Sequence, residues 1–540
     1  MECDLILRHA TVVDGSGAEP VTGDVAVDGG SIRAVGSLGD LKGANEVDCT
    51  GKVVAPGFID MHSHSDWVAP LPEHGDVLAP LVEQGITTMI GGNCGCSPAP
   101  YLPSNKKLLP LVGRMLHDHE LDYGWSSMGS FLDALEQRGV VLNIAQLVGH
   151  GTVRVAAMGS SQAAANAEQI AAMADLLRAG LDEGAIGFST GLGYAPGVYA
   201  DTNELVGITA PLKERGGIYT SHARSYIALG RFDDANQVPS NLHALDETAA
   251  IGRAHGVKVQ HSHLIFVGDK TWPTTDRALE HLDRLASEID IGCDAFPYVG
   301  GNTTLVVFMP PWTLNNLKDA TSDPEQRERV AGTLTWVLPA LGMRWADTQI
   351  LWVPDESKAH YQGLTVAEIA ADRGKGETET YLDLVHELGS QTRIMNWNYS
   401  GRDGEEASLR KVLQHPLTCF EADTILTGNG FDNPASYGNF PRVLGRYVRD
   451  LKLITLPDAI RRMTGASAAR FGIKDRGLIA PGLAADLVVF DPLTVGDNTT
   501  RSQPNRSPSG IETVLLNGEI VVRKGKFARS SRAGKVLRRA

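Results

Sequence analysis

The sequence predicts an α/β protein with a (β/α)8 barrel and a small β-sandwich built from both chain termini. The first observation is a long middle region in which short apolar runs alternate with helical segments. The second is that both ends of the chain consist of short apolar runs separated by turns. Strands that alternate with helices form parallel sheets, and eight of them favour a closed barrel whose chemistry lies at the carboxyl ends of the strands.

The two ends of the chain are predicted to pair into one small domain. Residues 1–55 contain stretches of alternating apolar and polar residues separated by turns, and residues 475–540 repeat this pattern in GLAADLVVFDP and IETVLLNGEIVVRKGKF. Because these β-rich ends flank a long α/β region, we expect them to form the sandwich and residues 56–474 to form the barrel.

The middle region supplies the candidate barrel strands. Helical segments such as 161–184 and 241–256 lie between several of them. A segment of about residues 300–395 interrupts the alternation before the last strand, and its Trp, Leu and Met content predicts an ordered, lid-like insertion rather than a disordered linker. The candidate strands are GFIDMHSH, ITTMIGGN, LNIAQLVGH, GAIGFSTG, GIYTSHA, VKVQHSH, IDIGCDAFPY and TILTGNG.

The composition is that of an ordinary globular protein and argues against several classes of partner. The 540 residues carry a net charge of −15 with a pI near 5.5, which disfavours nucleic acid and anionic membranes as partners. No apolar run reaches the roughly 18–20 residues of a membrane span. Six scattered cysteines and the lack of a signal-peptide pattern predict a cytoplasmic protein. As its partner we expect a small-molecule substrate. The sequence leaves open whether the protein forms a homo-oligomer.

Histidines at the end of the first candidate strand predict a metal site. In PGFIDMHSHSD, His62 and His64 are two residues apart, so a strand places both side chains on one face at the barrel mouth. Neutral imidazoles with this spacing suit a divalent transition metal. The alternative is two exposed histidines in a turn, which fits less well with a pair that ends a buried strand.

Three further strand ends offer donors of the same kind. GGNCGCSPAP presents Cys94, with Cys96 as a competitor two residues on. TSHA and QHSH present His222 and His263, with His261 as a competitor on the same strand face. Each of these residues, taken alone, is most often a core or loop residue. Donors at four strand ends together indicate one zinc centre.

Longer phrases run through the chain almost from end to end, among them VVAPGFIDMHSHSD, GNCGCSPAP, VGHGTVR, IGFSTGLGYAPGVYA, YTSHARS, QHSHL, DAFPY and YGNFPRVLGRYV. With these phrases the chain resembles the amidohydrolase superfamily and, within it, the D-aminoacylase (N-acyl-D-amino-acid deacylase) group. The resemblance implies a barrel with a sandwich from both termini, in agreement with the pattern of strands and helices. It also implies zinc-dependent hydrolysis of a C–N bond other than a peptide bond, by metal-activated water.

The resemblance further implies which residues bind the metal. The tight zinc site of the group would fall on Cys94, His222 and His263, and a weaker second site on His62 and His64. Many amidohydrolases instead bridge two metals with a carbamylated lysine at the end of strand four. Because GAIGFSTGLGY contains no lysine, a cysteine-ligated site is the consistent alternative.

The last candidate strand departs from the pattern of the group. The group has a catalytic aspartate at the end of strand eight, and a gapless alignment through YGNFPRVLGRYV puts Asn429 at that position. Asn cannot carry a proton from water to the leaving nitrogen, a loss that typically costs about 10²–10⁴-fold in rate. Three interpretations are open: an engineered Asp→Asn substitution, a natural divergence in which another group moves the proton, or a remodelled loop whose true carboxylate is Asp432.

Two positions that recognise a substrate carboxylate in the group also differ. The group has a Lys shortly after the strand-six His and an Arg on the strand-eight loop, where this chain has Ile265 and Ala435. Because a buried carboxylate without a cation is costly, we expect a neutral or apolar amide, cyclic amide or ester. Arg224 in SHARSY is the alternative substrate-binding cation, unless it forms a structural ion pair.

Two tyrosines complete the predicted site. Tyr194 in GLGYAPG and Tyr298 in DAFPYVGG are expected to contact the substrate, and Tyr298 is also a candidate catalytic donor to the developing oxyanion. The alternative functions are an N-acyl-D-amino-acid deacylase, a catalytically impaired or non-hydrolytic metal-binding protein, and a lyase on the same scaffold.

Overall fold

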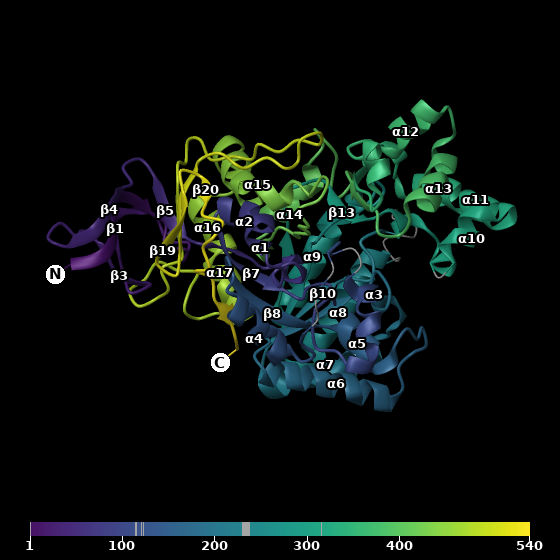
Figure 1. The fold of residues 1–540 in the computed structure, drawn as a ribbon, viewed down its shortest axis with the longest axis horizontal. Coiled ribbons are helices and arrows are strands. Elements are labelled where there is room, and N and C mark those ends of the chain that lie inside the picture. Colours follow the sequence, from purple (N-terminus) through teal and green to yellow (C-terminus); the bar gives the residue numbers. More distant parts are fainter. Residues whose placement is uncertain are drawn as a thin grey trace.

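The computed structural model describes residues 2–113, 116–119, 121, 124–228, 238–314 and 316–539. Three sheets organise the chain. In Figure 1 the β-rich terminal unit lies at one end, the barrel occupies the centre, and a mainly helical insertion projects at the other end.

The central sheet is a parallel barrel, which confirms the predicted fold class. Its eight strands follow one another in chain order, and β21 (Val536–Leu537) adds to the edge of one of them. The barrel closes where Ser63 bridges Thr424 and the His64 amide donates to the Thr424 carbonyl at 2.9 Å. The strands are β6 (Phe58–Asp60), β7 (Ile86–Gly91), β8 (Asn143–Gly149), β9 (Gly187–Gly191), β10 (Ile218–His222), β11 (Lys258–His261), β12 (Ile291–Ala295) and β16 (Thr418–Phe420).

Helices between the strands cover the outside of the barrel, where apolar side chains form the largest core. These helices are α1 (His74–Val77), α2 (Ala79–Glu83), α3 (Pro110–Gly113), α4 (Met128–Arg138), α5 (His150–Met158), α6 (Ala167–Asp182), α7 (Thr202–Arg215), α8 (Ser240–His255), α9 (Thr275–Ala286), α14 (Ala407–Gln414), α15 (Ala435–Arg442), α16 (Leu456–Met463) and α17 (Gly465–Phe471). Among the described residues, no helix has the length and apolar character that crossing a membrane requires.

The last barrel strand differs from its prediction. We expected a strand at 424–430, but the strand is the three-residue β16, in which Cys419 pairs with Asp294 of β12. Residues 424–430 lead out of the barrel instead, because Gly428 and Gly430 adopt φ of 80° and 71° and the chain reaches solvent there. The end of strand eight therefore lies several residues earlier than the sequence indicated.

Both chain ends contribute to the terminal sheet, as expected from their shared pattern. The joint is the antiparallel pairing of β5 with β17, which aligns Val54 with Val489. The last residues leave this sheet, since Val536 pairs with Ile144 of the barrel. The strands are β1 (Glu2–Val12), β2 (Val21–Asp28), β3 (Ser31–Gly36), β4 (Lys42–Asp48), β5 (Val53–Pro56), β17 (Leu487–Phe490), β18 (Ile511–Leu516), β19 (Glu519–Arg523) and β20 (Lys526–Phe527).

The segment predicted as a lid-like insertion is ordered and has an apolar core of its own. A three-stranded antiparallel sheet ties its beginning to its end, since Gly301 pairs with Asn396. Whether it acts as a lid stays a prediction. Its strands are β13 (Gly301–Thr304), β14 (Thr348–Trp352) and β15 (Arg393–Asn396), and its helices are α10 (Leu317–Ser322), α11 (Pro324–Leu341), α12 (Val366–Arg373) and α13 (Glu377–Leu388).

Candidate metal centre

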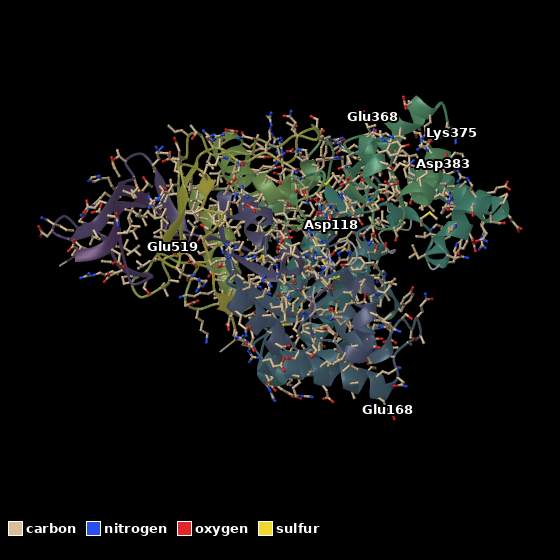
Figure 2. All side chains as sticks on the ribbon, in the orientation of Figure 1. Asp118, Glu168, Glu368, Lys375, Asp383 and Glu519 are labelled. Atoms are coloured by element: carbon tan, nitrogen blue, oxygen red, sulfur yellow. The ribbon has the colours of Figure 1, made fainter. Side chains whose placement is uncertain are left out.

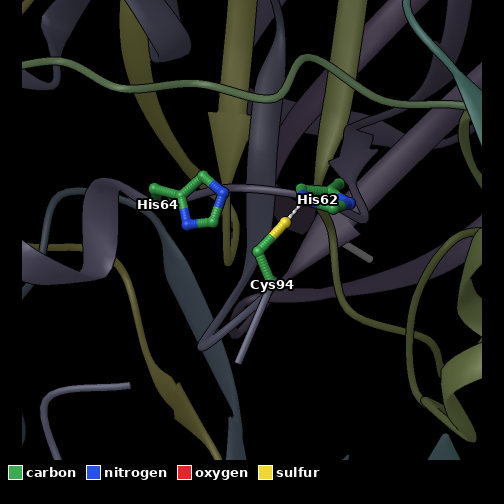
Figure 3. Close-up of side chains that lie close together, drawn as sticks. All are labelled: His62, His64 and Cys94. Carbon is green, nitrogen blue, oxygen red and sulfur yellow. Dashed lines mark hydrogen bonds between the residues drawn. The ribbon is translucent and has the colours of Figure 1, made fainter. Parts of the chain in front are cut away.

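Five side chains with metal-binding donors meet at the carboxyl ends of the barrel strands. They form two groups that share Cys94, one with His62 and His64 and the other with His222 and His263, and within each group the donor atoms lie within 4.8 Å of one another. Figure 3 shows the first group, with the Cys94 sulfur directed at the His62 ring. The parallel strands explain the meeting, because all their carboxyl ends open at the same side of the barrel.

The backbone around the centre is unusual. Cys94, His263 and Asp423 adopt φ of 53°, 31° and 47°, in the left-handed region that side chains other than Gly rarely enter. Such conformations cost about 1–3 kcal/mol each and persist where the surroundings impose them, often at functional sites. The His263 amide, for example, donates to Asp294 Oδ1 at 2.6 Å. Each of the three residues follows a barrel strand, so the left-handed turn directs its side chain at the centre of the mouth.

The second group has the spacing of a tetrahedral zinc site. Cys94 Sγ lies 3.7 Å from His222 Nδ1 and 3.6 Å from His263 Nε2, and these two nitrogens are 3.0 Å apart. Ligands of a tetrahedral zinc are separated by about 3.5 Å for a sulfur and a nitrogen and about 3.3 Å for two nitrogens. The residues present therefore fit a zinc ion.

The first group adds a shared sulfur and a carboxylate. Cys94 Sγ lies 3.1 Å from His62 Nε2, while Asp423 Oδ1 lies 3.4 Å from His64 Nε2 and 3.7 Å from His62 Nε2. The Nδ1 atoms of His62, His64 and His263 are buried without a hydrogen-bond partner among the described residues.

Electrostatics favour a positive charge at this centre. Burial opposes ionisation of Cys94, but the neighbouring imidazoles of His62, His222 and His263 hold the pKa of its thiol well below the usual range, and the thiolate is the form that binds metals. Burial also opposes a charge on His64, yet Asp423 and Cys94 raise its pKa to about 9. A divalent cation supplies this positive charge when bound.

The two competing residues lie outside both groups. Cys96 directs its sulfur to the Cys94 carbonyl at 3.4 Å. His261 packs edge-on against the Tyr226 ring, and burial lowers its pKa to about 3. Among the described residues, Cys94 and His263 are therefore the members that meet the other donors.

Comparison with known proteins identifies the family. The model of the amidohydrolase family matches residues 45–262 and 391–522, which leaves out most of the insertion. The D-aminoacylase of Alcaligenes xylosoxydans xylosoxydans is 36% identical over 99% of this chain and 98% of its own length. The chain belongs to the amidohydrolase family. Amidohydrolases hydrolyse C–N bonds other than peptide bonds with the help of bound metal, so the predicted enzyme class is confirmed.

Two solved structures share the whole architecture of this amidohydrolase. One is a D-aminoacylase whose study concerns the functional role of a binuclear metal centre, with one-metal activation and second-metal attenuation. It is 33% identical, covers 99% of this chain and 100% of its own, and has a TM-score of 0.81. The other is the N-acyl-D-glutamate deacylase of Bordetella bronchiseptica with zinc and a phosphonate that mimics the tetrahedral intermediate, 32% identical over 100% of both chains with a TM-score of 0.81.

The carboxylate beside the histidines is Asp423, not a residue at position 429. Asn429 is exposed, and its Nδ2 donates to Asp118 Oδ2 at 3.2 Å. Figure 2 labels Asp118 near the middle of the molecule, where Arg393 also donates to the Asn429 carbonyl at 3.2 Å. The placement of Asn429 at the strand end is thus corrected together with the strand itself. Asp432 is buried against Tyr437, whose hydroxyl is 3.2 Å from Oδ2, and belongs to neither donor group.

The signal for Asp423 was present in the sequence but was missed. FEAD places two acidic residues immediately after the apolar run TCF, a composition typical of a buried strand that ends in an active site. The run TCF is only three residues long, so the pattern favours the longer candidate TILTGNG, which lies on the wrong side of the aspartate.

Of the predicted substrate contacts, Tyr194 lies against the metal centre and two others are engaged elsewhere. The Tyr194 ring lies 4.8 Å from the His222 ring, and its hydroxyl donates to the Cys94 carbonyl at 3.0 Å. The Tyr298 hydroxyl donates to Asp497 Oδ2 at 3.0 Å. The Arg224 guanidinium donates twice to Glu247, at 2.9 Å each, and also to two backbone carbonyls, which fits the structural ion pair considered as its alternative.

The two positions where the D-aminoacylase group has a Lys and an Arg belong here to one apolar cluster beside His222 and His263. Ile265 and Ala435 are buried in a cluster with Tyr226, Phe296 and Tyr298. The Tyr226 ring connects this cluster to the metal centre, since it lies 5.1 Å from the His222 ring and 5.0 Å from the His263 ring.

Proposed function

We propose that this amidohydrolase uses zinc to hydrolyse an amide or cyclic amide bond in a neutral or apolar small molecule. Cys94, His222 and His263 hold the principal ion, and His62 and His64 contribute to a second, weaker site. The observation that carries the proposal is the donor set: one thiolate and two imidazole nitrogens at the spacing that tetrahedral zinc requires. The zinc in the N-acyl-D-glutamate deacylase supports the choice of metal.

When bound, the ion would polarise a carbonyl and lower the pKa of its water to about 7. Asp423 supplies the proton transfer: Oδ1 accepts a proton from the attacking water and returns it to the leaving nitrogen. Its position 3.4 Å from His64 Nε2 puts this carboxylate at the edge of the donor set. Because an aspartate occupies this place, the argument for an impaired or non-hydrolytic protein, which depended on Asn429, loses its basis.

The preference for a neutral substrate follows from the charges around the apolar cluster. Ile265 and Ala435 offer no cation, and two arginines beside the cluster are paired: one follows Ala223, and the other lies over the Tyr298 ring. Arg224 binds Glu247, and Arg442 lies 3.1 Å from Asp497. Among these described positions, a free substrate carboxylate in the cluster would find no unpaired cation, which is a large penalty in a buried site.

An N-acyl-D-amino-acid deacylase is the second candidate, because D-aminoacylase and N-acyl-D-glutamate deacylase are similar to this chain over its full length. Both candidates use the same metal centre and differ in how the substrate carboxylate is recognised. A cytoplasmic location and an association of copies stay predictions.

The test compares N-acetyl-D-leucine with its uncharged amide and methyl ester, with the zinc-loaded enzyme and acetate release as the measurement. We expect kcat/KM to be at least about tenfold higher for an uncharged member, and a chelator to abolish turnover until zinc is added back. A preference for the free acid would support the deacylase instead. No acetate from any member at full zinc content would count against hydrolysis, and cleavage without incorporation of labelled water oxygen would indicate a lyase.

A further inference from the structure

Three of the tyrosines near the metal centre donate their hydroxyl hydrogen bond to another group of the protein. Tyr194 donates to the Cys94 carbonyl, Tyr226 to the Ser262 carbonyl and Tyr298 to Asp497, each at 3.0 Å. A phenol has a single proton to donate. These hydroxyls therefore fix the loops around the metal donors, and none is free to donate to a substrate oxygen without breaking a bond to the protein.

Tyr399 is different, because its hydroxyl has no hydrogen-bond partner in the part of the chain that the structure describes. The residue is half-buried, and its ring packs against the apolar cluster that contains Ile265, Tyr298 and Ala435. A phenol that is half-buried beside an active site and leaves its proton unused is placed to donate to a ligand.

The backbone holds Tyr399 firmly at the barrel mouth. Its amide donates to the Val299 carbonyl at 2.8 Å, in the loop after β12. The next residue, Ser400, donates its amide to the Phe266 carbonyl at 2.9 Å and receives the Phe266 amide on Oγ at 3.1 Å. The segment just after the insertion is thus joined to the segment that follows His263, which fixes the ring before any substrate arrives.

The ring itself has little freedom. Gly301 lies so close that a Cβ at this position would come within 2.4 Å of the Tyr399 ring. Burial, together with the charge of Asp423, raises the pKa of the Tyr399 phenol, so the hydroxyl keeps its proton at neutral pH.

We propose that Tyr399 is a substrate-contacting residue of this site, whose hydroxyl donates to the carbonyl oxygen of the scissile amide. The inference rests on the proposed amide hydrolysis. As the carbonyl carbon becomes tetrahedral, negative charge grows on that oxygen, and a fixed donor stabilises it more strongly than the neutral substrate. Tyr399 follows the insertion directly and lies within the second segment that the family model matches, residues 391–522.

The variant Tyr399→Phe tests this, since it removes the hydroxyl and keeps the ring. We expect kcat for the uncharged amide to fall about 10²-fold with KM changed less than about threefold, because the loss falls on the transition state. Tyr381→Phe is the matched control: it removes a hydroxyl that donates to the Leu305 carbonyl at 2.8 Å inside the insertion. It should leave kcat within about threefold of the parent. Zinc content and thermal midpoint are measured for each protein.

A binding measurement makes the test independent of turnover. The probe is N-(methylphosphonyl)-D-leucinamide, a tetrahedral mimic of amide hydrolysis, titrated into the zinc-loaded proteins by calorimetry. We expect Tyr399→Phe to bind the mimic at least about tenfold more weakly than the parent and the control do. This difference is smaller than the expected loss of kcat, because a stable mimic reproduces only part of the transition-state interaction. Equal affinity, or an unchanged kcat, would overturn the role of Tyr399. A parent that binds the mimic with this difference but releases no acetate from any amide would refute the proposed function and keep the hydroxyl contact.

Discussion

Replacing Asp423 by Asn separates the two positions that compete for the proton transfer. The substitution keeps the size of the side chain and its carbonyl oxygen but removes the ability to accept and return a proton. Asp423 Oδ1 lies 3.4 Å from His64 Nε2, whereas Asn429 is exposed and bonded to Asp118. The site geometry therefore predicts that a substitution at position 423 changes kcat strongly and that a substitution at position 429 does not.

The expected magnitude follows from the chemistry of proton transfer. General acid–base catalysis contributes about 10²–10⁴-fold, which equals about 3–5 kcal/mol of the activation barrier. We expect Asp423→Asn to lower kcat for the uncharged amide by this factor. Zinc at the Cys94, His222 and His263 site should stay bound, because Asp423 forms its ion pairs with the other two histidines.

The assay is steady-state acetate release at saturating amide, with zinc per chain measured on the same samples. The matched variant is Asn429→Asp, which adds a carboxylate where the sequence alone had placed one. It should not raise kcat, since the new charge would face Asp118 at the end of a loop. The reasoning is refuted if Asp423→Asn retains activity within threefold at full zinc content, or if Asn429→Asp raises kcat tenfold.

Four further outcomes follow from the structure. Cys94→Ser should lower bound zinc well below one ion per chain, measured after dialysis, whereas Cys96→Ser should retain it; equal loss in both would exclude the assigned thiolate. Ile265→Lys should raise kcat/KM for N-acetyl-D-leucine at least about tenfold relative to its amide, and no change in this ratio would remove the apolar cluster from substrate recognition. Arg224→Leu should lower the free energy of unfolding by about 1 kcal/mol without changing substrate preference, because its partly exposed ion pair is structural. Burial raises the pKa of Asp432 to about 7, so the folded state binds more protons than the unfolded state from about pH 4 upward. The free energy of unfolding should then fall as pH rises from about 4 to 7, and Asp432→Asn should flatten this dependence.

The barrel and the metal donors could be predicted from the sequence because local patterns carry them. A histidine pair two residues apart at the end of an apolar run defines its face by strand periodicity alone. The later strands repeat the arrangement with Cys94, His222 and His263, and parallel strands bring their ends together in any closed barrel. The separation of Cys94 from Cys96 and of His263 from His261 needed the structure, since both members of each pair fit the same face.

The roles of the tyrosines and of Arg224 were beyond the sequence for a different reason. Tyr298 donates to a residue 199 positions away, and Arg224 binds Glu247 on a neighbouring helix. Whether a side chain is free for a substrate depends on such distant partners, which no local pattern records. Tyr399 lies in no motif at all, and only the absence of a partner within the described residues sets it apart.

The left-handed residues show why the position of the carboxylate beside the histidines was hard to infer. A strand that continued in register past β16 would send alternate side chains into and out of the barrel, whereas position 429 was chosen by a gapless alignment through YGNFPRVLGRYV. Asp423 breaks the alternation with a φ of 47°, while the amide of Ala422 donates to Asp60 at 2.9 Å and Thr424 bridges to Ser63. The chain thus turns once and places the carboxylate beside His64. It then pairs, through the bridge of Thr424 to Ser63, with the segment that follows the first strand of the barrel. Because closure of the barrel imposes this turn, the strained aspartate is a property of the whole barrel, and the sequence around it resembles an ordinary loop.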